Sequence, residues 1–461
     1  MARDFQQMYK DKLRSAADVA KLVEPGWWID IGMFNGKSIA FERELAARKD
    51  ELKDIRCYTA VAMPPIPEIL SKDPKGEVFT YIDYHFSPLS RYVQQVRPNV
   101  FYNPTHFGES EGWFELKYSD PEKIGTRHRE MTVCRTTPMD KDGYFNFGLQ
   151  NGITWQLLNT ATKYRVVEVC HDMPYCLGGS REAVHISDVD FVIEEENSPM
   201  YEMPNTVPSE VDKQIATNAL AHIRDGCTIQ LGIGGMPNAL GQIIAQTDLK
   251  NLGGHTEMLG DAYKFMIEAG NMNDSQKFLS RGRTVYTFAA GTNEFYEWMN
   301  NNSKLASYNV EFVNEPTALA HIDNLVSINQ ALEVDIYCQV SAESSGFQQI
   351  SGNGGMLDFV LGSFYSKGGR SLICFPSTHT DKEGKLHSRI VPAFREGTIV
   401  TIPRQTANIF VTEYGSVSLK GLGTWERAAA LVSLAHPDFR DDLIKAAQAR
   451  KIWTRTNKIN D

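Results

Sequence analysis

The sequence has few cysteines and no close pair of them. Seven cysteines are scattered from Cys57 to Cys374, an odd number with no C-x-x-C spacing. This pattern excludes a disulfide-stapled scaffold and predicts reduced thiols, as in cytosolic proteins. No apolar run approaches the roughly 20 residues needed to span a bilayer, and the charged start MARDFQQMYKDKL lacks the apolar centre of a signal peptide. We therefore expect a soluble, cytoplasmic protein with no membrane partner.

An excess of positive charge is also missing. The formal net charge is -10 at pH 7, from 47 Lys and Arg against 57 Asp and Glu. This balance argues against nucleic acid as a partner, because phosphate backbones attract basic surfaces. It leaves room for a local basic pocket that holds one phosphorylated ligand.

Several common catalytic motifs do not occur. The chain has no G-x-S-x-G turn, and no two of its 11 histidines are spaced H-x-x-x-H. The turn G-I-G-G at Gly232–Gly235 matches part of a dinucleotide-binding motif, but the third glycine of G-x-G-x-x-G is replaced by Pro237. Glu257 still follows at about the offset of a ribose-binding acid, so spacing alone leaves that interpretation open.

What the sequence does contain is an internal repeat. Its 461 residues are enough for two domains. A helix, a turn, a strand and a glycine loop recur at an offset of 200 positions, a spacing shown by the pairs Gly26 and Gly226, Ile29 and Ile229, and Gly32 and Gly232. A weaker echo relates D-K-D-G-Y at Asp140 to D-I-Y-C-Q at Asp335. We infer two copies of one α/β unit.

Strands that alternate with helices predict α/β units with largely parallel sheets. A charged, proline-rich segment, Glu194–Pro208, is the expected linker between the copies. Strands are expected in the first copy at Trp27–Ile31, Cys57–Val61, Val78–Tyr81, Val100–Tyr102, Glu130–Arg135, Arg165–Val169 and Asp188–Ile193. In the second copy they are expected at Cys227–Leu231, His255–Met258, Thr284–Phe288, Ser307–Phe312, Leu332–Tyr337, Ser371–Phe375, Ile399–Ile402 and Asn408–Thr412, followed by helix over Thr424–Ala449.

The second copy concentrates the candidate chemistry in two glycine-rich loops. The strand Cys227–Leu231 feeds the turn Gly232–Gly235, after which Pro237 suits the first turn of a helix. Glycine lets backbone N–H groups approach a ligand closely, so this turn can hold an anion or an oxyanion. The segment Ser351–Phe359, S-G-N-G-G-M-L-D-F, has the same character. Two such loops are expected to face one long ligand.

Glu257 is the candidate reactive acid. It lies at the end of the strand His255–Met258, before a helix Ala262–Ala269 that we expect Asp261 to cap and Gly270 to end. Ligands bind at strand ends in open α/β sheets. The carboxylate could act as general base, metal ligand or nucleophile. His255 shares its strand face, but no third ligand is evident, so a metal is disfavoured. Spacing does not separate base from nucleophile.

The motifs together resemble a known family. They are L-G-I-G-G-M-P-N-A, G-G-H-T-E-M-L-G-D, V-N-E-P, S-I-N-Q-A-L-E-V-D, Q-V-S-A-E-S-S-G, Q-I-S-G-N-G-G-M-L-D-F and T-E-Y-G-S-V-S-L-K-G. In this order they resemble the acetyl-CoA hydrolase/transferase group of the class I coenzyme A transferases, and most nearly its butyryl-CoA and 4-hydroxybutyryl-CoA transferase branch. The resemblance covers nearly the whole chain. It implies two tandem, topologically related α/β domains, with 1–205 on the acyl side and 206–461 carrying the catalytic glutamate and CoA loops.

The resemblance also implies roles for individual residues. Glu257 takes the place of the catalytic glutamate. Asn314 and the backbone of Gly355 would donate hydrogen bonds to the thioester oxygen. The expected CoA-binding residues are Gly232, Ile233, Gly234, Gly235, Met236, Leu332 and Gly355. No metal and no permanently bound cofactor are implied, because CoA acts as a cosubstrate. Relatives are commonly homodimers or larger homo-oligomers.

The activity implied is transfer of CoA from a short acyl-CoA, such as acetyl-CoA or succinyl-CoA, to a short carboxylate. Butyrate, 4-hydroxybutyrate or a dicarboxylate such as itaconate are candidate acceptors. The route would run by ping-pong through a glutamyl-CoA thioester on Glu257. Two alternatives stay open at this point: an acyl-CoA hydrolase that uses Glu257 as the base for water, and a CoA-binding protein without catalysis.

Overall fold

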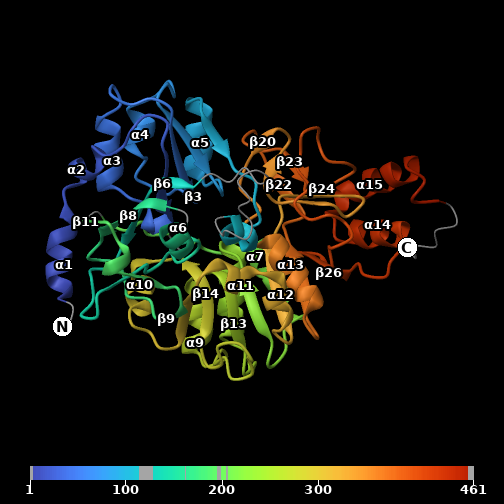
Figure 1. Cartoon of the computed structure of the whole chain (residues 1–461). Helices are drawn as coiled ribbons and strands as arrows, with labels where there is room; N and C mark the ends of the chain where they lie inside the picture. Colours follow the sequence, from blue (N-terminus) through green and yellow to red (C-terminus); the bar gives the residue numbers. More distant parts are fainter. Residues whose placement is uncertain (1–3, 114–127, 161, 195–198, 204–205, 455–461) are drawn as a thin grey trace. The chain divides into compact units, whose positions relative to one another are not determined.

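The chain folds into two compact units (Figure 1). The computed structural model describes residues 4–113, 128–160, 162–194, 199–203 and 206–454. Unit 1 comprises Met1–Met203 and Val285–Val313, and unit 2 comprises Pro204–Thr284 and Asn314–Asp461. A single division near residue 205 was expected, whereas the segment Val285–Val313 lies in unit 1. The expected linker Glu194–Pro208 lies partly outside the described residues.

Unit 1 contains a parallel sheet with strand order β1-β11-β8-β6-β2-β3-β4-β5. The strands are β1 (Leu13–Arg14), β2 (Trp28–Met33), β3 (Ile55–Ala60), β4 (Phe79–Asp83), β5 (Val100–Tyr102), β6 (Arg129–Thr136), β8 (Thr162–Val169) and β11 (Phe191–Ile193). The helices are α1 (Phe5–Lys12), α2 (Ala16–Ala20), α3 (Ala40–Ala47), α4 (Glu68–Ser71), α5 (Pro88–Val96), α6 (Thr154–Thr160), α10 (Asn293–Met299) and α11 (Val310–Asn314), of which Asn314 belongs to unit 2. Unit 1 also holds β7 (Tyr144–Asn146), β9 (Gly178–Ser180), β10 (Ala183–His185), β14 (Thr284–Ala289) and β15 (Leu305–Tyr308), of which Thr284 belongs to unit 2.

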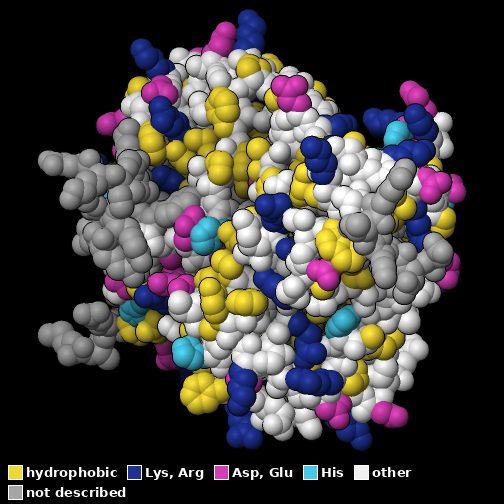
Figure 2. Space-filling model, turned by 90° about the vertical axis from the view of Figure 1, so that its right-hand side faces the viewer, with side chains coloured by type: hydrophobic (Ala, Val, Ile, Leu, Met, Phe, Trp, Pro, Cys, Tyr) yellow, Lys and Arg dark blue, Asp and Glu magenta, His cyan; other side chains and the backbone are white. Residues whose placement is uncertain are grey.

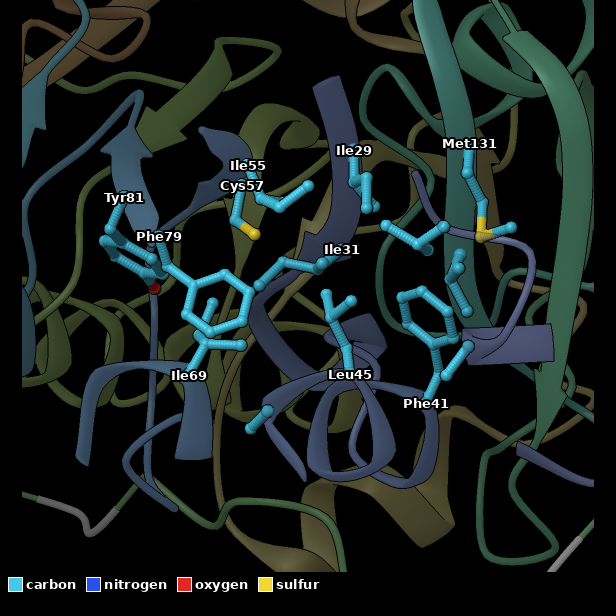
Figure 3. Close-up of a cluster of buried hydrophobic side chains, with 14 of the residues drawn as sticks. Ile29, Ile31, Phe41, Leu45, Ile55, Cys57, Ile69, Phe79, Tyr81 and Met131 are labelled. Carbon is cyan, nitrogen blue, oxygen red and sulfur yellow. The ribbon is translucent and has the colours of Figure 1, made fainter. Parts of the chain in front are cut away.

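The core of unit 1 lies between this sheet and the helices packed on it. Alternate residues of β2, Ile29 and Ile31, point to one face and are fully buried. Phe41 and Leu45 of α3 pack against them, as Figure 3 shows. Alternation in the strand and helical spacing in α3 thus produce one apolar layer, which is what the sequence pattern predicts.

Unit 2 contains a second sheet with strand order β26-β25-β21-β16-β12-β13, parallel except for β26. Its strands are β12 (Thr228–Leu231), β13 (Gly253–Leu259), β16 (Leu325–Gln330), β21 (Arg370–Cys374), β25 (Ile409–Thr412) and β26 (Gly415–Ser418). Its helices are α7 (Glu210–Leu220), α8 (Gly235–Ile244), α9 (Asp261–Glu268), α12 (Pro316–Ala320), α13 (Met356–Tyr365), α14 (Thr424–Ser433) and α15 (Pro437–Ala449). Shorter strands follow the sheet: β17 (Glu333–Asp335), β18 (Val340–Ser341), β19 (Ser344–Ser345), β20 (Gln348–Gln349), β22 (Thr378–Thr380), β23 (Leu386–Ser388) and β24 (Ile390–Val391).

The two units repeat one topology, as the sequence offset predicted. The order β8-β6-β2-β3 in unit 1 corresponds to β21-β16-β12-β13 in unit 2. The weaker echo is also a real repeat of local structure. Asp140 Oδ1 accepts hydrogen bonds from the N–H groups two and four residues later, and Asp335 Oδ1 does the same. The side-chain acceptor explains why an aspartate begins both turns.

Three local predictions were wrong. The expected strand Ser307–Phe312 ends at Tyr308, because the chain turns into α11, and Ile399–Ile402 forms only an isolated bridge at Ile402. The N-cap of α9 is Gly260 rather than Asp261, which is the first residue of the helix. The predicted helical part Thr424–Ala449 is confirmed, and it is divided into α14 and α15 because Pro437 begins a new helix and cannot continue α14.

The central strand β16 was not predicted, although L-V-S-I-N-Q is short and largely apolar. Its neighbours on both sides bury it in the middle of the sheet. All seven cysteines are free and buried. Among the described residues, none of the helices has both the length and the apolar character that a membrane crossing requires.

Candidate active site

Glu257 lies near the carboxyl end of β13, next to the end of β12. The two strands are parallel and in register from Thr228 opposite Gly253. Thr256 Oγ1 donates a hydrogen bond to the carbonyl oxygen of Leu231 at 3.2 Å, which fixes the end of β13 beside the start of the glycine turn. The predicted placement of Glu257 at a strand end is therefore observed.

Two donors from distant parts of the sequence meet at the Glu257 carboxylate. Asn314 Nδ2 donates to Glu257 Oε2 at 2.5 Å, and the backbone N–H of Gly355 also donates to this carboxylate. Asn314 is the last residue of α11 and is fully buried. Gly355 is the N-cap of α13. The three residues that the resemblance selected thus form one cluster.

Only glycine fits at position 355. A Cβ atom there would lie 2.2 Å from Glu257 Oε2 and 2.3 Å from Asn314 Nδ2, far inside van der Waals contact. The φ of Gly355 is -93°, so the requirement comes from this close approach and not from backbone conformation. The preceding residue, Gly354, has a φ of +55°, which favours glycine for conformational reasons.

Burial dominates the electrostatics of Glu257. It raises the pKa of the Glu257 carboxyl to about 8, because the charged form loses solvation. The hydrogen bonds from Asn314 and Gly355 act in the opposite direction, since they favour the carboxylate. The negative charge of Asp358, one turn along α13, adds to the increase. A perturbed carboxyl in such surroundings is a common feature of functional sites.

The segment after Asn314 keeps it in place. Glu315 is the N-cap of α12, and its carboxylate accepts a hydrogen bond from the N–H of Ala318. Pro316 occupies the first turn of the helix, where its missing N–H costs nothing. Asn314 Oδ1 is buried and has no hydrogen-bond partner among the described residues. Asn314 is therefore more than a turn residue before proline, because its amide is directed at a carboxylate.

The glycine turn ends in the uncapped beginning of α8. Gly234 is the N-cap, with a φ of +117° and no side-chain capping bond, and the helix begins at Gly235, so Pro237 lies in its first turn as predicted. A Cβ on Gly232 would meet no atom within 4 Å, whereas one on Gly235 would meet Asp212 at 2.8 Å. Ile233 is partly exposed and Met236 is buried. The first N–H groups of α8 therefore remain available for an anion.

Leu332 lies just beyond the end of β16. Its N–H donates to the carbonyl of Ser341 at 2.8 Å, and its carbonyl oxygen accepts from Arg389 Nη1 at 2.8 Å. Its N–H is therefore already used within the protein, and its carbonyl retains one lone pair for a ligand.

Sequence reasoning missed two residues that shape the site. The N–H of Leu231 donates to the buried hydroxyl oxygen of Tyr263 at 2.8 Å, which holds the strand end below the glycine turn. Asp358 was quoted in a motif but given no role. Its helical spacing of three residues from Gly355 was the available signal. No group of three or more His, Cys, Asp or Glu side chains arranged to hold a metal ion occurs in the described part of the chain.

Comparison with known proteins gives consistent matches. The N-terminal domain of the acetyl-CoA hydrolase/transferase family matches residues 1–203, and its C-terminal domain matches residues 291–447. A butyryl-CoA:acetate CoA-transferase of Anaerostipes caccae is 42% identical, over 98% of this chain and 100% of that protein. A 4-hydroxybutyrate coenzyme A transferase of Clostridium kluyveri is 33% identical, over 97% and 100%. The crystal structure of RipA from Yersinia pestis superposes with a TM-score of 0.86 at 30% identity, covering 98% of this chain and 100% of that one.

Proposed function

The chain belongs to the acetyl-CoA hydrolase/transferase family, and we propose that it is a CoA-transferase that works through a covalent intermediate on Glu257. The observation that carries the proposal is the pair of donors on the buried Glu257 carboxylate: Asn314 Nδ2, which donates to Oε2 at 2.5 Å, and the N–H of Gly355. A carboxylate on the surface is hydrated by water, whereas the buried Glu257 carboxylate accepts its hydrogen bonds from these two protein donors.

The chemistry divides one exchange into two reversible halves. The Glu257 carboxylate attacks the thioester carbonyl of acyl-CoA, and the CoA thiolate leaves as an acyl-glutamyl anhydride forms. The thiolate then attacks the glutamyl carbonyl, which releases the first carboxylic acid as its carboxylate and leaves a glutamyl-CoA thioester. The incoming carboxylate reverses both steps. No ATP is consumed, and ping-pong kinetics follow.

Asn314 and Gly355 are placed for the second of these attacks. When the thiolate adds to the glutamyl carbonyl, negative charge develops on a Glu257 oxygen. Asn314 Nδ2 and the N–H of Gly355 already donate hydrogen bonds to the Glu257 carboxylate. Preformed donors of this kind stabilise an oxyanion without reorganisation, and removing one typically costs about 10²–10³ in rate.

The substrates are proposed to be short acyl chains. The relatives named for butyryl-CoA, acetate and 4-hydroxybutyrate support a short-chain acyl-CoA as donor and a short carboxylate as acceptor. Acetyl-CoA and succinyl-CoA are the donors to try first. Butyrate, 4-hydroxybutyrate and itaconate are the acceptors, and a panel of such acids against one donor ranks them.

Trapping of the intermediate tests the proposal. Wild-type protein given acyl-CoA without an acceptor should gain the mass of CoA, and hydroxylamine should remove it. Glu257→Gln keeps the shape of the side chain and should never gain the adduct. Release of free CoA that is equally fast with and without an added carboxylate would instead identify a hydrolase, with Glu257 as base. Unchanged activity in Glu257→Gln would show that Glu257 has no catalytic role. Absence of any CoA transfer or release by the wild type would leave only CoA binding.

A further inference from the structure

Two arginines flank the segment that follows β16. Gln330, the last residue of β16, lies beside the glycine turn, because a Cβ on Gly234 would be 3.7 Å from Gln330 Oε1. Two residues later, the carbonyl of Leu332 accepts a hydrogen bond from Arg389 at 2.8 Å. The next residue, Glu333, has its Oε1 atom 3.8 Å from Arg395 Nη2. The arginines therefore lie along the chain that leads away from the glycine turn.

Within the described ranges of the chain, Arg389 forms no ion pair with a carboxylate within 4.0 Å. Its hydrogen bonds go to backbone carbonyls, those of Leu332 and Thr378. It is partly buried, and burial lowers the pKa of its guanidinium, with the more distant charge of Glu333 acting in the opposite direction. A partly buried charge without an ion-pair partner is costly unless something compensates it. A bound anion would do so.

Positive charge extends around Arg389. The rings of His379 and His387 stack with their centroids 5.3 Å apart. His379 Nδ1 is buried without a hydrogen-bond partner among the described residues. After burial, the main causes that lower the pKa of His379 are the charges of Arg389, His387 and Arg395. The negative charge of Asp381, which lies 2.6 Å from His387 Nε2, acts on His379 in the opposite direction. The three basic neighbours have the larger effects on His379, so its surroundings favour an anion.

The segment that holds the two arginines is basic in a chain that is acidic overall, and one face of the molecule displays several basic side chains. Between Lys385 and Arg404 there are four basic residues and one acidic residue, Glu396, in a chain whose net charge is -10. Figure 2 views the side on which α14 and α15 lie and shows Lys and Arg side chains gathered along the middle of that face. Basic charge is therefore concentrated locally, which is the arrangement a phosphorylated ligand needs.

An exposed aromatic ring accompanies the arginines. The side chain of Phe347 is 83% exposed, which is unusual for a large apolar group. Its ring lies against Gly397, where a Cβ would be 2.5 Å from Phe347 Cδ1. Gly397 is two residues from Arg395 in the same loop. Arginines beside an exposed ring match a nucleotide, because phosphates bind guanidinium groups and a base stacks on the ring.

We propose that Arg389 and Arg395 bind the phosphates of CoA, and that Phe347 offers its ring to the adenine. This inference rests on the proposed function, since it assumes CoA as cosubstrate. The spacing is suitable. The thiol must reach Glu257 on β13, while the pantetheine arm separates it from the phosphates. β16 is two strands away from β13, about 10 Å, and the arginines lie beyond it.

A comparison of acyl-CoA with acyl-pantetheine, which has no phosphates, distinguishes phosphate binding by the arginines from a purely structural role. Arg395→Ala should raise KM for acyl-CoA by about 10- to 100-fold, the value of one or two charge-assisted hydrogen bonds, with kcat little changed. It should leave KM for the matching acyl-pantetheine unchanged, because that thioester has no phosphate. The side chain of Arg395 is 67% exposed, so its removal should not prevent folding. Arg389→Ala should act in the same direction.

The control is Arg281→Ala, which removes an exposed arginine in the loop before β14 and should change KM for neither acyl-CoA nor acyl-pantetheine. The proposal would be overturned if the arginine variants raised KM equally for acyl-CoA and acyl-pantetheine, or if neither variant changed KM for acyl-CoA. Failure of the proposed function gives a different result, in which the wild-type protein transfers neither CoA from acyl-CoA nor pantetheine from acyl-pantetheine to a carboxylate. Titration of the unmodified protein with CoA and with pantetheine then tests the arginines by affinity alone, and equal affinities would reject their role.

Discussion

At the scale of single residues, the site is an acid whose ionisation is balanced by opposing neighbours. Burial and Asp358 favour the neutral form of Glu257, whereas Asn314 and Gly355 favour the carboxylate. With a pKa of about 8, roughly a tenth of the molecules carry the charged form at pH 7. A poorly solvated carboxylate is a stronger nucleophile than one in water, and the donors keep it accessible as an anion.

Gly355→Ala should abolish most activity without unfolding the protein. The added methyl would occupy the space 2.2 Å from Glu257 Oε2 and displace either the acid or Asn314. We expect a loss of about 10²–10³ in kcat or more. Gly423→Ala is the matched control, since Gly423 is also a helix N-cap with negative φ, and its Cβ would meet only the end of the Glu426 side chain. Steady-state kinetics and thermal unfolding of both variants test this prediction, and an equal loss of kcat in both variants would contradict it.

The pH dependence of the reaction should move in opposite directions in two variants. In the proposed mechanism Glu257 reacts as the carboxylate, so kcat/KM of the wild type should rise with pH and level off above about pH 8. Asp358→Asn removes a negative charge that raises the pKa of Glu257 and should shift this limb to lower pH. Asn314→Ala removes a hydrogen bond that lowers it and should shift the limb upward. A limb that stays in place in both variants would show that another group controls the profile.

At the scale of elements, the site exists because several helices and strands end at one place. β13 brings Glu257, the end of α11 brings Asn314 and the start of α13 brings Gly355. The adjacent helices α8 and α9, which follow the glycine turn and β13, are also closely packed. A Cβ on Gly241 of α8 would lie 2.8 Å from the Cβ of Ala262 in α9, so these two helices touch at backbone distance.

Gly241→Ala therefore tests the packing of the helix that carries the glycine turn. In an isolated helix this change would stabilise by about 1 kcal/mol. Here we expect a net loss of about 1–3 kcal/mol, because α8 must move away from α9. The turn at its N-terminus would move with it and raise KM for acyl-CoA. Thermal unfolding gives the sign directly, and a higher melting temperature would contradict the close contact.

At the scale of the whole molecule, unit 1 buries several acids to which no catalytic role has been assigned. Burial raises the pKa of Asp30 to about 6 and the pKa values of Glu42, Asp83 and Glu111 to about 7. In the unfolded chain the same groups ionise near pH 4. Between those values the folded protein holds more protons than the unfolded chain, so these groups make stability fall as pH rises from about 4 to 7.

Asp83→Asn should remove part of that dependence. Asp83 Oδ1 accepts from the N–H groups of Val61 and His85, and Oδ2 accepts from the Ser90 hydroxyl. An asparagine can keep the first two bonds and donate to the Ser90 oxygen, so the shape is preserved and the titrating proton is lost. The variant should gain stability relative to wild type at pH 8 and gain less at pH 5. Urea unfolding at both pH values measures this, and an equal difference at both would refute it.

The sequence by itself determined the repeat, the α/β class and most strands, because periodic apolar patterns and turn residues act locally. The motif resemblance singled out Glu257, Asn314 and Gly355, which lie up to 98 positions apart. Only the tertiary structure decided that they touch, that no Cβ fits between them, and that Asp358 opposes their effect on the pKa. The tertiary structure also places β16 between β12 and β21 and brings the charges of Arg389 and Arg395 near His379. These depend on desolvation and on distances between chain segments, which no local pattern encodes.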